Sequence, residues 1–287
     1  MEFLAILIAV AIMHLRGTGM PLQQDGWFHT LRGLLAPYLA EGPRQVVLVV
    51  LPTLVVLVLQ AVLDGRFYGL AELVFFVVVL IYSLGRGRLT EELGEYLLRW
   101  SRSDFQAAYR QLATDPGVGL GEDDGISNPA ALHAVARRQL YYRGFERGFV
   151  VLFWFFFLGP AGAVAYRMAV LVNAMRRAEG LASEDSTLLR WIEWLPVRVC
   201  GLAFALVGHF DRALYAWQRV MGNSRIATAE ALELCGNAAL DLDVPADGED
   251  RAALIERGTR ELQAVASLGG RAFILWLVIM GLLAMIF

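Results

Sequence analysis

The chain alternates between long apolar stretches and shorter segments that hold most of its charged residues. The most apolar stretch, residues 149–172, combines aliphatic side chains with a run of phenylalanines and a tryptophan. A helix needs about 20 apolar residues to cross bilayer hydrocarbon, since each residue advances the helix by about 1.5 Å. Residues 149–172 therefore predict a membrane-spanning helix, which contains Gly159 and Pro160 near its middle.

Five further stretches resemble membrane helices. Three of them are predominantly apolar, so the predicted fold class is an all-α, polytopic integral membrane protein with at least four spans. Residues 1–15 are short, and residues 191–207 contain Glu193 and Arg198, so these two stretches would raise the number of spans to six. We expect the spans to form a single membrane domain over residues 1–287. The predicted membrane segments are residues 1–15, 45–63, 70–84, 149–172, 191–207 and 272–287.

A polar region at residues 85–147 predicts a helical loop between spans. Thr90 can cap a helix that ends near Leu112, because a side-chain hydroxyl accepts hydrogen bonds from the unpaired N–H groups of a first turn. Asn128 and Pro129 predict the start of a second helix, with an amide cap followed by proline at the first helical position. We expect that second helix to lead directly into the following span.

The distribution of arginine predicts which loops are cytoplasmic, since short loops rich in cations stay inside. With six spans, three regions lie in the cytoplasm: the loop with Arg32 and Arg44, the polar region described above, and a second helical loop at residues 209–270. Arg176 and Arg177 would then face outward, against the rule.

The composition excludes several kinds of chemistry. All 25 cationic residues are arginines, and the chain has no lysine, which both a Walker A phosphate loop and Schiff-base catalysis require. The net charge of −3 indicates no nucleic-acid partner. Cys200 and Cys235 are too few for a disulfide framework, and the four histidines lack the spacing of a zinc site. We therefore predict no metal and no resident cofactor.

Two loop motifs have only a partial likeness to ligand-binding loops. The motif GVGLG at residues 117–121 has no strand before it, so we expect no phosphate-binding turn there. Residues 241–250 are acidic, but Pro245 and Ala246 stand where a calcium loop needs a ligand and a glycine. This stretch predicts a solvated acidic turn.

Ionisable residues inside the predicted spans are functional candidates, because an unpaired charge in hydrocarbon costs from about 3 to more than about 10 kcal/mol. Two interpretations fit them. In the structural one, the arginines reach the headgroups along their apolar stems and Glu193 is paired. In the functional one, the side chains line a polar pocket between helices, whose guanidinium groups bind an anion. The candidate ligand-binding residues are Tyr166, Arg167, Glu193, Trp194, Arg198 and His209.

The segment that begins at Trp191 carries a specific pattern. Trp194, Pro196, Arg198 and Gly201 form a W-x-P-x-R-x-x-G core, which is followed by a Gly-His pair. Together with the aromatic run of the strongest span, this core resembles the AmpE family over nearly the whole chain. The resemblance implies a multi-pass protein of the bacterial inner membrane, in contact with lipid, with a regulatory role in AmpC β-lactamase induction and cell-wall recycling. Together with the arginines of the candidate pocket, it suggests an anionic cell-wall metabolite or a lipid headgroup as ligand, and a homodimer stays open.

The AmpE family is in turn similar to the adenosylcobinamide-phosphate synthases, membrane enzymes that form an amide bond with ATP. Several polar segments of those synthases are replaced in this sequence, so the resemblance favours a non-enzymatic regulator. The alternative is a ligase or transferase that uses ATP and magnesium. A transporter is a third interpretation, since interrupted helices often line substrate sites. Under the enzyme alternative, the residues for substrate or metal are Arg102, Asp104, Glu146 and Arg167.

Overall fold

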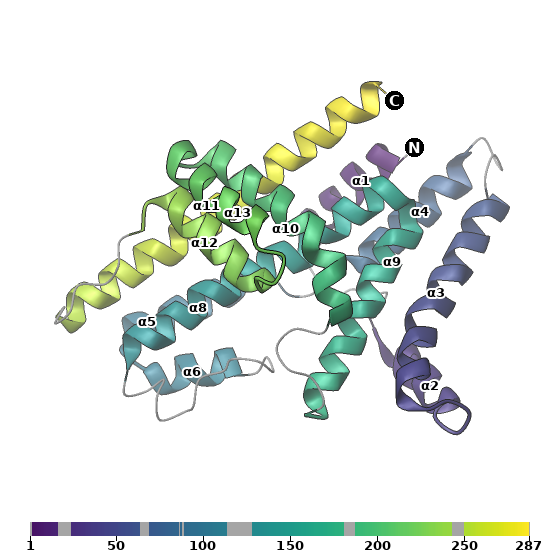
Figure 1. Ribbon diagram of the computed structural model, residues 1–287, viewed down its shortest axis with the longest axis horizontal. Coiled ribbons are helices and arrows are strands. Elements are labelled where there is room, and N and C mark those ends of the chain that lie inside the picture. The colour runs from purple at the N-terminus through teal and green to yellow at the C-terminus, as the bar shows by residue number, and fades with distance from the viewer. Residues whose placement is uncertain are drawn as a thin grey trace. The chain divides into compact units, whose positions relative to one another are not determined.

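The computed structural model describes residues 2–16, 24–63, 69–85, 87, 89–113, 128–180, 187–242 and 250–286. Within these residues every regular element is a helix (Figure 1), which confirms the all-α prediction. The motif at residues 117–121 and residues 243–249 of the acidic stretch lie outside the described residues. The elements are α1 (Glu2–Arg16), α2 (Gly26–Leu35), α3 (Glu41–Leu63), α4 (Leu70–Ser83), α5 (Leu89–Ser101), α6 (Phe105–Ala113), α8 (Pro129–Gly144), η3 (Phe145–Phe149), α9 (Val150–Ala178), α10 (Thr187–Val207), α11 (Phe210–Gly222), α12 (Thr228–Leu240) and α13 (Arg251–Ile286).

Three described helices are long and apolar enough to cross a membrane, namely α3, the continuous run Pro129–Ala178 and α13. The span predicted at residues 70–84 is shorter than expected. Its helix α4 has 14 residues, which is roughly 21 Å, against a hydrocarbon thickness of about 30 Å. Helix α10 has 21 residues, but its three charged side chains make it less apolar. The chain is thus an all-α membrane protein, and the number of its passes stays a prediction.

Contacts divide the chain into two compact units. Unit 1 consists of Met1–Gly87, Val150–Ile192 and Met280–Phe287, and unit 2 consists of Arg88–Phe149 and Glu193–Ile279. Two units defined by contacts can belong to one domain, so the expected single membrane domain stays a prediction.

In unit 1, α2, α3, α4 and α9 share an apolar core. Phe28 of α2 packs with Leu48 of α3 and with Met168 and Val172 of α9, and all four side chains are buried. Burial of this apolar area holds the short helix α2 against the longer ones.

Helix α9 is broken at Gly159, whose φ of 64° and ψ of −159° lie outside the helical region. Glycine adopts this φ without steric cost, and Pro160 has no N–H with which to continue the helical hydrogen bonds. The chain then folds back sharply, because a Cβ placed on Gly162 would lie 2.5 Å from the carbonyl oxygen of Trp154. The span predicted at residues 149–172 is therefore two helical halves and not one helix.

The second half of α9 runs antiparallel to α3. At the break, a Cβ placed on Gly159 would lie 3.3 Å from the amide nitrogen of Gln60, close to the end of α3. At the other end of α9, Arg176 Nη1 donates a hydrogen bond to Gln45 Oε1, close to the start of α3, at 2.9 Å. The second half of α9 therefore runs back along α3 and ends near the N-terminal end of α3.

This reversal corrects the expectation that Arg176 and Arg177 face away from the other arginines of the unit. Arg32 forms an ion pair with Glu179, directly after α9, and Arg44 lies in the first turn of α3. The four arginines therefore lie at one end of the α3–α9 pair, which agrees with the positive-inside rule. That this end faces the cytoplasm stays a prediction.

The reversal can be tested with single cysteines and a maleimide that does not cross membranes. Gly42→Cys and Ala178→Cys, both at exposed positions, should react in the same preparation, either intact spheroplasts or inverted vesicles. Leu70→Cys, at the start of α4, should react in the other preparation. Labelling of Gly42→Cys and Ala178→Cys from opposite sides would show that α9 continues through the membrane without turning back.

Unit 2 corrects one sequence prediction. The single helix expected from Thr90 to about Leu112 is two helices, α5 and α6. Ser103, between them, has a φ of 59°, and Asp104 Oδ1 accepts a hydrogen bond from a backbone N–H in the first turn of α6 at 3.0 Å. The capping carboxylate starts a new helix where the hydrophobic pattern alone continues. Thr90 lies inside α5 and not before it.

The start of α8 agrees with its prediction. Asn128 Oδ1 accepts a hydrogen bond from the backbone N–H of Ala131 at 3.1 Å, and Pro129 is the first helical residue. Helix α8 continues through the π-helical turn η3 into α9, which confirms that it leads directly into the following span. Near the C-terminus, residues 251–271 and the apolar residues 272–286 form the single helix α13.

Candidate functional site

In unit 1, the intramembrane candidate Arg167 has a carboxylate partner. Its Nη2 lies 3.2 Å from Asp25 Oδ2, and the two side chains are only 11% and 13% exposed. The Tyr82 hydroxyl donates a hydrogen bond to Asp25 Oδ1 at 3.3 Å, and Trp27 Nε1 donates to the Tyr82 oxygen at 3.1 Å. Asp25 was not a sequence candidate, because it lies in a polar loop, and only the pairing of distant helices shows its role.

In unit 2, the candidate Arg198 is bound to backbone carbonyls. Its guanidinium donates to the carbonyl oxygens of Trp194 at 2.9 Å and of Val220 and Asn223, both at 3.1 Å. It also lies over the Trp194 ring, 4.1 Å from the centroid. Among the described residues Arg198 has no carboxylate partner. Its charge instead faces the negative end of the α11 dipole, so Arg198 joins α10 to the C-terminal end of α11.

The remaining candidates have separate surroundings. Glu193 is buried and its Oε1 accepts a hydrogen bond from the Tyr142 hydroxyl at 3.1 Å. His209 is exposed at the N-cap position of α11, and Tyr166 is buried in α9 of unit 1. Since Tyr166 and Arg167 belong to unit 1 and the other four candidates to unit 2, the shared pocket stays a prediction.

The three residues of the enzyme alternative that lie in unit 2 are also separate. Arg102 and Asp104 are exposed in the turn between α5 and α6, where Asp104 caps α6. Glu146 is partly buried in η3. Within the described part of the chain, no three His, Cys, Asp or Glu side chains are placed to hold a metal ion.

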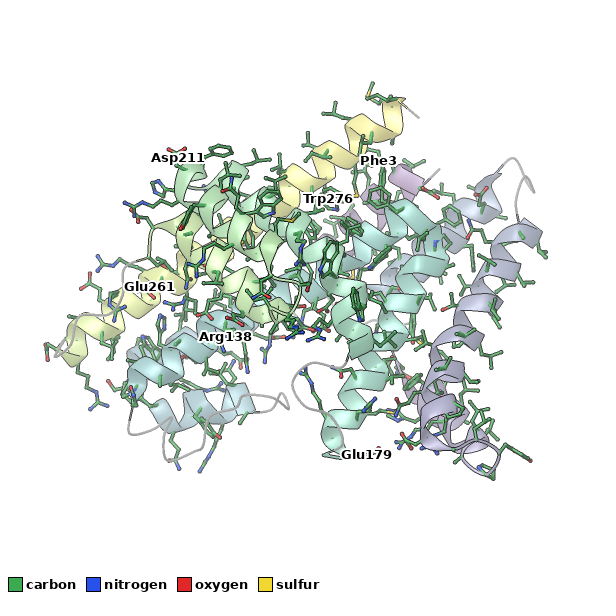
Figure 2. All side chains as sticks on the ribbon, viewed as in Figure 1. Phe3, Arg138, Glu179, Asp211, Glu261 and Trp276 are labelled. Atoms are coloured by element: carbon green, nitrogen blue, oxygen red, sulfur yellow. The ribbon has the colours of Figure 1, made fainter. Side chains whose placement is uncertain are left out.

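A buried ion cluster in unit 2 was missed by the sequence analysis. Glu261 of α13 accepts from Arg257 Nη1 at 2.7 Å and from Arg137 Nη1 at 2.9 Å, and its Oε2 lies 2.9 Å from His133 Nε2. Figure 2 shows Glu261 on α13 and Arg138 on α8. Glu261 lies in the polar half of α13, outside the apolar residues 272–286.

The pKa of Glu261 reflects these contacts. Burial would raise the pKa of this carboxyl, but hydrogen bonds from His133 and Arg257 and the charges of His133 and Arg137 lower it to about 2. The carboxylate is therefore ionised at neutral pH, and it compensates the positive charge that surrounds it.

Arginines follow one another along α8 and η3 and contact carboxylates on other helices. Arg137 and Arg138 both contact Glu233, at 3.4 and 2.7 Å. The next two, Arg143 and Arg147, donate to the two oxygens of Glu92 at 2.9 and 2.7 Å. The signal in the sequence was the repeated arginine between residues 137 and 147, but its partners lie on other helices and could not be read from spacing.

The cysteines are core residues, as expected. Cys200 and Cys235 are both buried and neither forms a disulfide. Burial raises the pKa of the Cys235 thiol to about 12, so this thiol is unreactive at neutral pH.

Comparison of the chain with known protein families gives one match over most of its length. The family described as "Regulatory signalling modulator protein AmpE" matches residues 1–255. The chain is 24% identical over 186 residues to Protein AmpE of Shigella flexneri, which is 62% of this chain and 65% of that protein. No solved structure gives a significant match.

Two further relatives are described as Cobalamin biosynthesis protein CobD. The one from Chromobacterium violaceum is 25% identical over 157 residues, which is 52% of this chain and 48% of that protein. The one from Stutzerimonas stutzeri is 27% identical over 176 residues, which is 60% of this chain and 55% of that protein. The chain thus spans between 48% and 65% of the length of these three relatives. Since the family match extends over most of its length, the chain belongs to the AmpE family.

Proposed function

We propose that this protein is a signalling modulator of the bacterial inner membrane, tied to AmpC β-lactamase induction and cell-wall recycling, and that it responds to an anionic ligand. The regulatory part of this proposal rests on membership of the AmpE family. The anionic ligand rests on one observation in unit 2: the guanidinium groups of Arg143 and Arg147 meet at the carboxylate of Glu92.

Two guanidinium groups that meet at the carboxylate of Glu92 gather several N–H donors at one place in unit 2. The side chains of Arg143, Arg147 and Glu92 are 15%, 23% and 30% exposed, so a solute can reach them, yet they are screened less than on an open surface. Guanidinium is planar, keeps its charge at all physiological pH values and matches the oxygens of phosphate or carboxylate with paired N–H groups. A phosphorylated or carboxylated cell-wall fragment would therefore replace part of the pairing to Glu92.

The test is β-lactamase induction in a strain from which this gene is deleted. The wild-type chain should restore induced activity, and the double variant Arg143→Gln/Arg147→Gln should reduce ligand affinity by roughly tenfold or more, since each lost hydrogen bond to a charged group is worth about 1.5–3 kcal/mol. The induced activity should fall accordingly at normal membrane levels of the protein. Arg260→Gln is the control, because Arg260 is 71% exposed and pairs with the exposed Glu256. Full induction by the double variant would refute the proposal.

A ligase or transferase of the cobalamin-assembly type is the second candidate, and the similarity to two CobD proteins favours it. It would use Arg102, Asp104, Glu146 and Arg167 for substrate or metal. ATP with magnesium should then raise the thermal midpoint of the purified protein, because a ligand of the native state stabilises it by mass action. An unchanged midpoint at saturating nucleotide would remove this candidate.

A further inference from the structure

A small cavity lies beside the arginine pair of unit 2, between α5, α6, α8 and α13. Its volume is about 30 Å³, and a single water needs about 10–15 Å³ on this measure. The cavity thus has room for roughly two water-sized groups, which is the scale of the oxygens of a carboxylate or a phosphoryl group. The polar side chains that line it are Glu92, Tyr96, Gln111, Gln139 and Arg143.

One of these side chains is buried without a partner. The Tyr96 ring stacks on Trp100 at 6.1 Å between centroids, and the residue is only 4% exposed. Its hydroxyl makes no hydrogen bond with any described group. Burial raises the pKa of Tyr96, so the hydroxyl stays protonated and can donate. A buried donor of this kind is stabilised by an acceptor, and Tyr96 is one of the residues that line the cavity.

Among the other lining groups, Gln139 and Arg143 carry N–H donors, while Gln111 already has partners. Gln139 Oε1 accepts from Arg143 Nη2 at 3.4 Å, which leaves the amide hydrogens of Gln139 for another acceptor. Gln111 Nε2 donates to the backbone oxygen of Glu92 at 2.9 Å, and its Oε1 accepts from Arg99. Glu92 is the one acid among the lining residues, and its two oxygens are held by Arg143 and by an arginine of η3.

We propose that this cavity receives the terminal oxyanion of the ligand, a phosphate or a carboxylate group. The Tyr96 hydroxyl, the Gln139 amide and the Arg143 guanidinium donate to its oxygens, while Glu92 competes for the same guanidinium. The inference rests on the proposed function only in taking an anionic ligand, and it adds the place and the donors. The rest of the ligand lies outside, because the cavity holds only the anionic end.

The first test uses the full chain, purified in detergent, with thermal midpoints measured in sodium phosphate, sodium acetate and sodium chloride at equal ionic strength. Phosphate or acetate should raise the midpoint to a plateau, and chloride should not. The salt that raises the midpoint, phosphate or acetate, identifies the kind of oxyanion that binds. Tyr96→Phe keeps the stacked ring and should weaken the apparent affinity by about tenfold. Tyr215→Phe, at a position that is 68% exposed, should leave the affinity unchanged.

A second variant distinguishes an oxyanion site from a water-filled gap. Glu92→Gln removes the competing charge, so oxyanion binding should become tighter by several-fold, while Glu95→Gln, whose side chain is 65% exposed, should have no effect. An equal response to all three salts, or weaker binding by Glu92→Gln, would overturn the inference.

The two proposals can fail separately. Saturable oxyanion binding that depends on Tyr96, together with unchanged β-lactamase induction in Tyr96→Phe cells, would keep the site and reject the proposed function. Induction that depends on Arg143 and Arg147 without any effect of phosphate or acetate would reject this cavity as the site.

Discussion

Replacing Glu261 by alanine should lower the free energy of unfolding by about 3–5 kcal/mol, because it removes the buried carboxylate at which Arg137, Arg257 and His133 meet. The Glu261 side chain is 7% exposed, and Arg137 and Arg257, which donate to it, are 13% and 22% exposed. Denaturant titration in mixed micelles, followed by tryptophan fluorescence, measures the loss. Trp100 is a suitable reporter, since its Nε1 donates a hydrogen bond to the backbone oxygen of Ile255, which lies on α13, the helix of Glu261.

Glu256→Ala is the matched control for this prediction. Glu256 lies on the same helix and pairs with Arg260 at 3.6 Å, but its side chain is 73% exposed. Exposed pairs at this spacing contribute about 0.3–0.5 kcal/mol, so the control should stay close to wild type. Equal losses in the two variants would mean that burial of the cluster has no energetic consequence.

The effect of Glu261 should also depend on pH in a defined direction. Its pKa is lowered from an ordinary value of 4.5 to about 2 in the folded protein. A group of this kind contributes stability above the unfolded pKa, and the contribution is lost as the pH falls through the folded pKa. The stability difference between wild type and Glu261→Ala should therefore be constant above pH 4.5 and shrink between 4.5 and about 2.

Asp25→Ala should be comparably destabilising in unit 1, by about 3–5 kcal/mol, because Arg167 would then be buried without a counterion. The Asp25–Arg167 pair is 13% and 11% exposed. Glu179→Ala is the control in the same unit: the Arg32–Glu179 pair is 27% and 34% exposed, and such pairs are worth about 1 kcal/mol or less. The denaturation midpoint of the full chain in detergent measures both.

A double variant separates the ion pair from simple loss of packing. Asp25→Ala combined with Arg167→Met removes both charges, so it should cost clearly less than the sum of the two single variants. Additive losses would show that the two side chains do not compensate each other, and the pairing seen in unit 1 would then have no energetic basis.

The sequence predicted those parts of the fold that depend on local chemistry. The apolar runs predicted at residues 45–63 and 272–287 correspond to α3 and to the last part of α13, which ends at Ile286, and Asn128 caps α8 as its side chain and the following proline indicate. The break at Gly159 could be seen as an interruption but not as a reversal, because the sign of φ at a glycine is not determined by neighbouring residues.

The hydrogen-bond and ion-pair partners of the candidate arginines could not be predicted for a different reason. Arg167 and Arg198 lie in α9 and α10, but their partners are a loop carboxylate in one case and carbonyls at the end of α11 in the other. Both partners come from segments distant in the chain, and hydrophobic periodicity carries no information on which helix ends meet. The arginines of α8 were overlooked because they lie outside the apolar runs.

The sharpest measurement is an experimental density map of the full-length protein prepared with and without phosphate. The proposals predict a difference peak in unit 2, within hydrogen-bond distance of the Tyr96 hydroxyl and the Arg143 guanidinium, and its loss in Tyr96→Phe. A map that shows no peak there at a phosphate concentration that stabilises the protein, or a peak that persists in Tyr96→Phe, would contradict oxyanion binding by this cavity.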